Sequence, residues 1–181
     1  MKKSLREILL VLALVLIDQS IKIYIYNNLM NKEFYIFGSI FGFKPIINTK
    51  YSYFNSFGNM GIGLITHIVL NIAMLFLILI IFDFIKERYS NNKIIYCLFV
   101  LACAAAICSL IDKIFWGGSL DFISFKNFFI FDLKDVYISV FQIVVMLCII
   151  LNYKKLKAIN EKTIYNEFKS YIKVKYFKRY I

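Results

Sequence analysis

The chain has 181 residues, of which 61% are hydrophobic, with one proline and a mean hydropathy of +0.71. Soluble domains are about 45–50% apolar, so this composition excludes an ordinary soluble protein and predicts an α-helical integral membrane protein. The length allows about four spans of roughly 20 residues and no second soluble domain. The net charge of +11 is segregated along the chain, so a membrane explains it and no nucleic-acid partner is expected.

Four apolar runs predict transmembrane helices, because backbone groups in lipid must be satisfied within their own segment. The predicted spans cover about residues 8–26, 61–84, 94–116 and 136–153. The first run follows Lys2, Lys3 and Arg6, as a signal peptide would, but it is longer than such a run and no small-residue cleavage site follows it. We therefore expect it to be retained as the first span.

The loop of residues 27–60 is rich in aromatic and β-branched residues. Its stretch F-Y-I-F-G-S-I-F-G-F-K-P-I-I-N predicts short strands with glycine turns. The loop of residues 117–135 has a similar composition, so the two loops can pair as a small β-rich region on the membrane surface.

Lysine and arginine are concentrated at the N-terminus, between the second and third spans, and after the fourth span. The positive-inside rule then places both termini in the cytoplasm and the loops 27–60 and 117–135 outside. We expect residues 1–153 to form a four-span membrane domain and residues 154–181 a basic cytoplasmic tail. This tail mixes lysine with Ile, Tyr and Phe, which is typical of an amphipathic helix on an anionic inner leaflet.

Two of the apolar spans contain charged residues, which are costly inside a membrane and therefore informative. Asp18 and Lys22 are four residues apart on one helix face and predict an internal ion pair. Asp112 and Lys113 lie near the end of the third span, on the side that carries Ser109 and several alanines. Each pair is compatible with a structural clamp between helices or with the support of a nearby site.

Asp121 opens and Asp135 closes a stretch between the third and fourth spans, with Asp132 just before its end. Acids at a membrane edge often serve only to solubilise a loop. Two carboxylates that meet, however, share one proton and provide a general acid and a general base near neutral pH. We interpret Asp121 and Asp135 as a pair that activates water against an amide, with no metal and no cofactor.

The four cysteines and the single histidine, His67, lie in apolar runs without metal-ligand spacing. We interpret them as packed residues rather than ligands.

The same polar residues give the chain a resemblance to the lipoprotein signal peptidases (signal peptidase II). The family motif D-Q-x-x-K is intact at residues 18–22. Four further motifs are similar in order and spacing: N-x-G at 48–50, G-N-x-x-D-R at 108–113, V-x-D-F-I at 119–123, and F-N-x-A-D at 131–135. The chain departs from these motifs most clearly at Lys50, Ser109, Lys113, Asp132 and Lys134. It is therefore identified as a divergent member, in which Asp132 adds a negative charge and Lys134 would offset it.

The resemblance implies a multi-pass membrane aspartyl peptidase of the bacterial cell membrane, active on the extracytoplasmic side. It implies that Asp121 and Asp135 are the catalytic acids and that Asn48 helps to hold the substrate backbone. Supporting or substrate-binding roles are implied for Asp18, Lys22, Ser109, Asp112, Lys113, Phe131 and Asp132. The implied substrate is a prolipoprotein, cleaved just before its diacylglyceryl cysteine, and the implied enzyme is a monomer in contact with membrane lipids.

Two other classes of function stay open. A non-catalytic or substrate-shifted homologue that binds lipoprotein signal peptides is suggested by the altered residues Ser109 and Lys113. An ion or proton transporter is suggested by buried Asp and Lys, although the sequence has no inverted repeat and no pair of Gly- or Pro-broken helices.

Overall fold

The computed structural model describes residues 2–36, 40–51, 55, 58, 60–89, 92–126, 128–158 and 160–177. Within these residues, four helical segments are long and apolar enough to cross a membrane. They are α1 (Lys2–Asn28), α3 (Leu64–Arg88), α4 (Lys93–Ile111) with its π-helical continuation η1 (Asp112–Trp116), and α5 (Leu133–Leu151). The predicted α-helical membrane fold with four spans is confirmed, while the side on which the termini lie stays a prediction.

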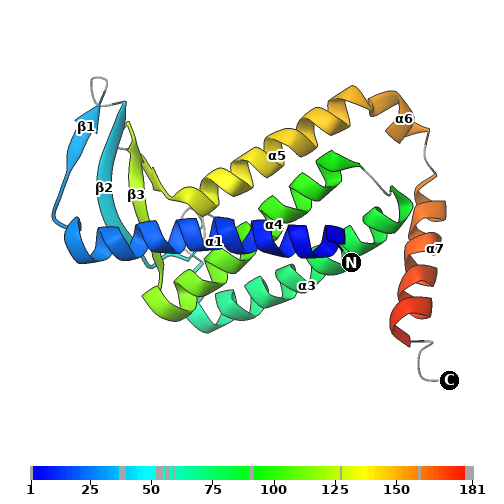
Figure 1. Cartoon of the computed structure of the whole chain (residues 1–181), viewed down its shortest axis with the longest axis horizontal. Helices are drawn as coiled ribbons and strands as arrows, with labels where there is room; N and C mark the ends of the chain where they lie inside the picture. Colours follow the sequence, from blue (N-terminus) through cyan, green and yellow to red (C-terminus); the bar gives the residue numbers. More distant parts are fainter. Residues whose placement is uncertain are drawn as a thin grey trace.

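Among the described residues, an antiparallel sheet of four strands lies at one end of the helices (Figure 1). Its strands, in order across the sheet, are β1 (Phe34–Ile36), β2 (Phe41–Asn48), β3 (Ser119–Phe125) and β4 (Phe129–Phe131). Strand β2 comes from the first predicted outer loop and β3 from the second, so the expected pairing of the two loops is confirmed. Part of the predicted strand region, residues 37–39, lies outside the described residues.

The register between β2 and β3 shifts between Phe43 and Ile46. Pro45 lies within this shift, and it has no N–H to donate to the ladder, which explains the irregularity. The ladder resumes beyond it and pairs Asn48 with Ser119. The two strands are therefore paired again where the sheet reaches the helices.

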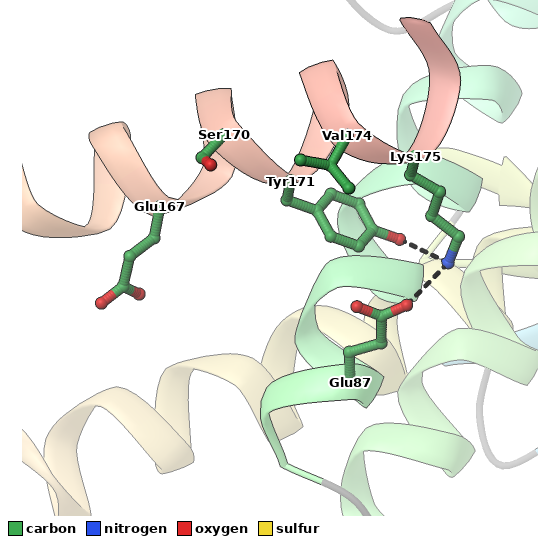
Figure 2. A pocket seen from close by; sticks show the side chains of 6 residues that line it. All are labelled: Glu87, Glu167, Ser170, Tyr171, Val174 and Lys175. Carbon is green, nitrogen blue, oxygen red and sulfur yellow. Dashed lines mark hydrogen bonds and ion pairs between the residues drawn. The ribbon is translucent and has the colours of Figure 1, made fainter. Parts of the chain in front are cut away.

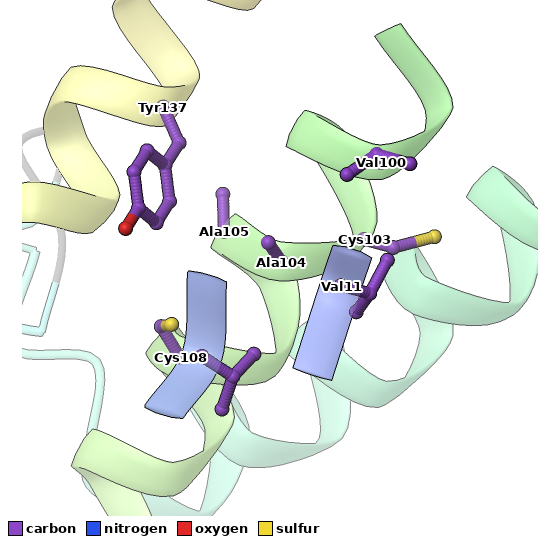
Figure 3. Packing of buried hydrophobic residues seen from close by; sticks show 8 residues of the cluster. Val11, Val100, Cys103, Ala104, Ala105, Cys108 and Tyr137 are labelled. Atoms are coloured by element: carbon purple, nitrogen blue, oxygen red, sulfur yellow. The ribbon is translucent and has the colours of Figure 1, made fainter. Parts of the chain in front are cut away.

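Helix α4 is central and contacts α1, α3 and α5. Its small side chains allow this close packing. The buried cluster consists of Val11, Val15, Val100, Cys103, Ala104, Ala105, Cys108 and Tyr137 (Figure 3). The interpretation of the cysteines as packed residues holds for Cys103 and Cys108, whereas Cys97 is exposed on the surface of the bundle. His67 is buried, and its Nδ1 lies 3.0 Å from the backbone oxygen of Gly63.

The outward faces of α3 and α5 are exposed and apolar. Ile65 and Phe76 of α3 are 78% and 62% exposed, and Met146 and Leu151 of α5 are 60% and 80% exposed. Such faces would be unfavourable in water and are favourable against lipid chains. They define the part of the molecule that the membrane surrounds.

Helix α5 begins at Leu133, earlier than the predicted start of the fourth span at residue 136. Asp132 is its N-cap and accepts a hydrogen bond from the backbone N–H of Asp135, while the Asp135 side chain accepts one from the backbone N–H of Asp132. This reciprocal capping box stabilises the additional turn. Asp135 therefore lies in the first turn of a helix rather than at the end of a loop.

The tail forms further helices at the end of the bundle away from the sheet (Figure 1). They are α6 (Tyr153–Lys157), α7 (Glu161–Ile172) and η2 (Lys173–Phe177). Phe84 near the end of α3 packs edge-on against Phe168 and Tyr171 of α7. Lys178 and Arg179, which contributed to the predicted basic tail, lie outside the described residues.

Candidate active site

Buried charged residues gather where the sheet meets α1, η1 and the first turn of α5. They are Asp18 and Lys22 of α1, Asp112 and Lys113 of η1, Asp121 of β3, and Asp132 and Lys134 at the start of α5. A charge in such a place is stable only when it is paired and hydrogen-bonded. The pairing therefore determines the geometry of this cluster.

Lys22 is the link between three segments. Its Nζ lies 2.8 Å from Asp18 Oδ2, 2.7 Å from Asp112 Oδ2 and 2.7 Å from Asp132 Oδ2. The predicted ion pair within α1 is thus confirmed, and the same ammonium also ties α1 to η1 and to the N-cap of α5. Gln19 strengthens this link, because its Nε2 donates to Asp18 Oδ2 at 3.0 Å and to Asp112 Oδ1 at 2.9 Å.

The π-helical turn η1 brings Asp112 to Lys22, while Lys113 turns back onto α4. Lys113 Nζ donates to Ser109 Oγ at 2.6 Å and to the Ser109 backbone oxygen at 3.2 Å. π-Helical turns within α-helices occur frequently at functional sites. The Ser109–Lys113 pair is a local contact on α4 and η1, and the two residues do not bond to Asp121 or Asp135 in the described structure.

Two glycines carry the chain from η1 into β3. Gly117 has a φ of +60°, which favours glycine, and a Cβ on Gly118 would lie 2.7 Å from the backbone oxygen of Asn48. This close approach places Ser119 directly opposite Asn48. Asp121 follows two residues later, on the same face of the strand as Ser119.

Asp121 and Asp135 lie close together, with Asp132 beside them. One carboxylate oxygen from each of the three residues lies within 4.8 Å of the others. Asp121 is 3% exposed and accepts hydrogen bonds from Ser119 Oγ at 2.6 Å and from Asn48 Nδ2 at 3.0 Å. Asp135 is half-buried. Side chains from β3 and from the start of α5 thus converge at one point of the junction between sheet and helices.

The surroundings shift the pKa values of Asp121 and Asp132 in opposite directions. Burial raises the pKa of Asp121 above its usual value, although the Lys134 ammonium and the Ser119 hydroxyl act in the opposite direction. Burial also acts to raise the pKa of Asp132, but Lys134 and Lys22 outweigh it and hold that pKa below its usual value. Asp132 is therefore a fixed anion, whereas the carboxyl of Asp121 takes up a proton more readily than an exposed aspartate.

Three neighbouring carboxylates could also bind a hard cation such as Ca²⁺ or Mg²⁺, which prefers oxygen ligands. Here, however, Lys134 Nζ contacts Asp132 Oδ2 and lies 3.3 Å from Asp112 Oδ2 and 3.7 Å from Asp121 Oδ1. Lys22 contacts the same oxygen of Asp132. The ammonium groups already supply the positive charge that these carboxylates need, so we assign no metal here.

The structure brings together most of the residues singled out from the sequence. Asp18, Lys22, Asn48, Asp112, Asp121, Asp132 and Asp135 belong to the hydrogen-bonded and ion-paired cluster. Asn48 bonds to Asp121 and, through its Oδ1, accepts from the backbone N–H of Lys50 at 3.0 Å. Phe131 stacks on Phe129 with ring centroids 5.5 Å apart and contributes no polar contact in the described structure.

Sequence reasoning missed Ser119 and Gln19. The Ser119 hydroxyl lies within hydrogen-bond distance of Asp121, Asp112, Asp132 and Lys134. Its position two residues before Asp121 on a strand was a usable signal, since such residues face the same side. Gln19 is part of the D-Q-x-x-K motif, but the network it makes with Asp112 depends on a contact between distant parts of the chain.

Two of the cavities formed by the described residues lie outside the buried charged cluster. One, of about 550 Å³, lies between the end of α3 and the tail and is lined by Glu87, Glu167, Ser170, Tyr171, Val174 and Lys175 (Figure 2). It is at the end of the bundle away from Asp121 and carries no catalytic assignment. The second, of about 380 Å³, lies between α1 and η1 and is lined by Gln19, Ile23, Ile111, Phe115 and Trp116. It is mostly apolar and adjoins the buried cluster through Gln19.

The fold is shared with solved bacterial membrane proteins. A bacterial membrane enzyme determined by the in meso method at 2.3 Å superposes with a TM-score of 0.66 and 20% identity, covering 86% of this chain and 93% of the other. A second, determined by the same method at 1.9 Å, gives a TM-score of 0.63 and 22% identity, with 80% and 92% covered. No curated protein matches the chain closely enough to count as a relative.

A family model provides the assignment. The model described as Signal peptidase (SPase) II matches residues 10–151. This range contains α3, α4 and α5, all of α1 from residue 10 onward, the sheet and the buried charged cluster. The chain therefore belongs to the signal peptidase II family, membrane proteases that remove signal peptides from lipoproteins.

Proposed function

We propose that this protein cleaves diacylglyceryl-modified prolipoproteins just before the lipidated cysteine, with Asp121 and Asp135 activating the attacking water. The observation that carries the proposal is the approach of these carboxylates to within 4.8 Å of one another at the junction of the sheet and the helices. A scissile peptide bond that follows a membrane-embedded signal helix reaches the same depth.

The chemistry follows from a single shared proton. Two neighbouring carboxyl groups ionise together less readily than either does alone, so in this proposal one stays protonated while the other accepts a proton. The ionised carboxylate takes a proton from water as the oxygen bonds to the carbonyl carbon. The protonated carboxyl gives its proton to the leaving nitrogen as the C–N bond breaks.

The surroundings of the site fit a lipidated substrate. The cavity between α1 and η1 is lined mainly by apolar side chains, among them Ile23 and Ile111, and can take an acyl chain or apolar signal-peptide residues. Exposed aromatic residues of the sheet region, such as Phe34 and Phe128, can rest on the membrane surface and cover the substrate.

The proposed setting is the bacterial cell membrane, with the sheet and the active site on the extracytoplasmic side. The distribution of lysine supports this, because the tail and the N-terminal segment are basic and lie away from the sheet (Figure 1). In this proposal residues 1–153 form the catalytic unit, active as a monomer.

The test is direct cleavage by the purified full chain in detergent or liposomes. A diacylglyceryl prolipoprotein is added, and release of the signal peptide is followed by gel or mass spectrometry. Asp121→Asn and Asp135→Asn should each lower the rate by about 100-fold or more, since a positioned acid or base contributes about 10²–10⁴-fold. Asp83→Asn is the matched control, because Asp83 is a partly exposed acid near the tail end of α3.

Cleavage that persists in both Asp121→Asn and Asp135→Asn would refute the assignment of the acids. A folded wild type that binds the prolipoprotein without cleaving it would favour the non-catalytic binder instead. Cleavage of an unlipidated prolipoprotein at the same rate would refute the substrate class.

A further inference from the structure

Lys134 places a buried cation beside the catalytic pair. It occupies the first turn of α5, and the residue is 7% exposed. Its Nζ contacts Asp132 Oδ2 and Ser119 Oγ, and it lies 3.7 Å from Asp121 Oδ1. This ammonium is therefore next to one of the two proposed catalytic acids.

The two acids have different surroundings. Asp121 faces Lys134 and also accepts hydrogen bonds from the Ser119 hydroxyl and the Asn48 amide. Asp135 accepts a hydrogen bond from the backbone N–H of Asp132 at 3.3 Å, and no lysine of the described residues lies within ion-pair distance of it. The Lys134 ammonium also attracts the Asp135 carboxylate, so it acts on both acids. The difference between the two acids lies in their hydrogen bonds, because two side-chain donors stabilise the anion at Asp121 and one backbone N–H stabilises it at Asp135.

The other charges around Asp121 do not remove this asymmetry. From α1, Lys22 is bound to Asp18, Asp112 and Asp132, and from η1, Lys113 is bound to Ser109. The remaining neighbours, Asp112 of η1 and Asp132 at the N-cap of α5, are themselves held by lysines. Within the described chain, Lys134 is the one cation at ion-pair distance from Asp121.

We propose that Lys134 keeps one member of the acid pair ionised at lower pH, while the hydrogen bonds from Ser119 and Asn48 select Asp121 as that member and leave the shared proton on Asp135. This inference rests on the proposed function. Lys134 is a positioning residue, because it acts on the two acids and does not itself touch the substrate.

The proton balance of one turnover follows. Asp121 accepts a proton from water as the water oxygen bonds to the carbonyl carbon, and Asp135 donates its proton to the nitrogen as the C–N bond breaks. Asp121 then carries a proton and Asp135 does not. Transfer of that proton back to Asp135, directly or through a new water, restores the starting state with Lys134 again beside an anion.

The experiment is the pH dependence of kcat/KM for prolipoprotein cleavage in wild type, Lys134→Met and Lys134→Arg. The low-pH limb reports the pKa of the group that must be ionised, which is Asp121 in this proposal. An opposite charge at this distance lowers a carboxyl pKa by about 1–3 units. In Lys134→Met the limb should therefore move to higher pH by about one unit or more, and in Lys134→Arg it should stay close to that of wild type.

Two further variants separate charge from structural damage. Lys134→Gln keeps a donor for Asp132 and Ser119 without the charge, and should move the limb as Lys134→Met does. It replaces the methionine variant if that variant does not fold. Lys113→Met removes a buried lysine that bonds to Ser109 rather than to Asp121. The low-pH limb of this variant should therefore lie at the same pH as in wild type, even if its cleavage rate is lower.

The outcomes are distinguishable. A limb that stays unchanged in folded Lys134→Met or Lys134→Gln would overturn the inference while leaving the proposed function intact. A limb that moves equally in Lys113→Met would also overturn it, because the shift would then be unspecific. A wild type that does not cleave would overturn the proposed function and this inference with it.

Discussion

Two serines on strand β3 have opposite surroundings. Ser119 Oγ donates to Asp121 at 2.6 Å and lies within hydrogen-bond distance of Asp112, Asp132 and Lys134. Ser124 is fully buried, and its hydroxyl has no hydrogen-bond partner among the described residues. The same residue type on one strand therefore offers a matched test of what the polar cluster contributes.

Ser119→Ala should lower the rate of signal-peptide release about tenfold or more, because a hydrogen bond to a charged group contributes about 1.5–3 kcal/mol. Ser124→Ala should leave the rate unchanged and keep or slightly raise the thermal stability, since it removes a buried hydroxyl without a partner. Both are measured by initial cleavage rates and by the unfolding midpoint in detergent. Equal losses in the two variants would contradict the role given to Ser119.

Lys22 should be among the most sensitive positions for stability. Lys22→Met leaves Asp18, Asp112 and Asp132 without their common cation, and breaking a buried pair from one side costs about 3–5 kcal/mol. The control is Lys44→Met, because the Lys44–Glu33 pair is about half exposed and such pairs contribute about 0–1 kcal/mol. Denaturant unfolding in mixed micelles measures the difference, and similar midpoints for both variants would contradict it.

At the scale of the element, the start of α5 determines where one of the proposed catalytic acids lies. Asp132 caps the helix and shares reciprocal hydrogen bonds with Asp135. The carboxyl of Asp135 is thereby fixed by the same contacts that begin the helix. The orientation of the Asp135 carboxyl therefore depends on the formation of the first turn of α5.

Asp132→Asn should retain cleavage better than Asp132→Ala. Asparagine caps helices about as well as aspartate, whereas alanine at an N-cap costs about 0.5–2 kcal/mol. Alanine removes the acceptor of the Asp135 backbone N–H and so loosens the first turn that carries the Asp135 side chain. Cleavage rates of the two variants are compared at one pH, with helix content followed by circular dichroism. A faster alanine variant would show that the cap does not position Asp135.

The tail helices α7 and η2 have an inner face on α3 and an outer basic face. Lys175 Nζ lies 2.6 Å from Asp83 and 2.8 Å from Glu87, while Tyr171 donates to Asp83 at 2.8 Å (Figure 2 shows Lys175 with Glu87 and Tyr171). Lys162, Lys169 and Lys173 are exposed. We expect this outer face to lie on anionic lipid headgroups.

The prediction for the tail is a difference in hydrogen exchange. Residues 161–177 should exchange amide hydrogens more slowly in nanodiscs with anionic lipid than in zwitterionic ones. Neutralising the outer face with Lys162→Gln, Lys169→Gln and Lys173→Gln should abolish the difference, because each lysine near the surface contributes about 1 kcal/mol. Identical exchange in both lipids for the wild type would contradict a lipid-bound tail.

The sequence was sufficient for the spans and for the pairing of the loops 27–60 and 117–135, because apolar length and β-branched composition are local signals. It was not sufficient for the start of α5, which depends on the reciprocal bonds of Asp132 and Asp135. It was also not sufficient for the partners of Lys22. Only one of its three carboxylates, Asp18, is a neighbour in sequence. Asp112 follows directly after α4, which packs against α1, and Asp132 comes from the N-cap of α5.

At the scale of the whole molecule, the sheet and the tail occupy opposite ends of the bundle (Figure 1). We therefore expect them on opposite sides of the membrane. Cysteines introduced one at a time at positions 44 and 165, in a background without the native cysteines, test this with a membrane-impermeant maleimide on intact cells. Lys44→Cys should react at once and Tyr165→Cys only after permeabilisation, and the reverse pattern would contradict the predicted orientation.

The buried charged cluster draws on both the first and the last of the long helices, with Lys22 on α1 and Asp135 in the first turn of α5. During synthesis, a ribosome must therefore deliver nearly the entire membrane domain before the second acid can join the first. In the proposed mechanism, a chain that ends before α5 has only one of the two acids and should not cleave. We therefore expect cleavage of a prolipoprotein to begin only after α5 has been made.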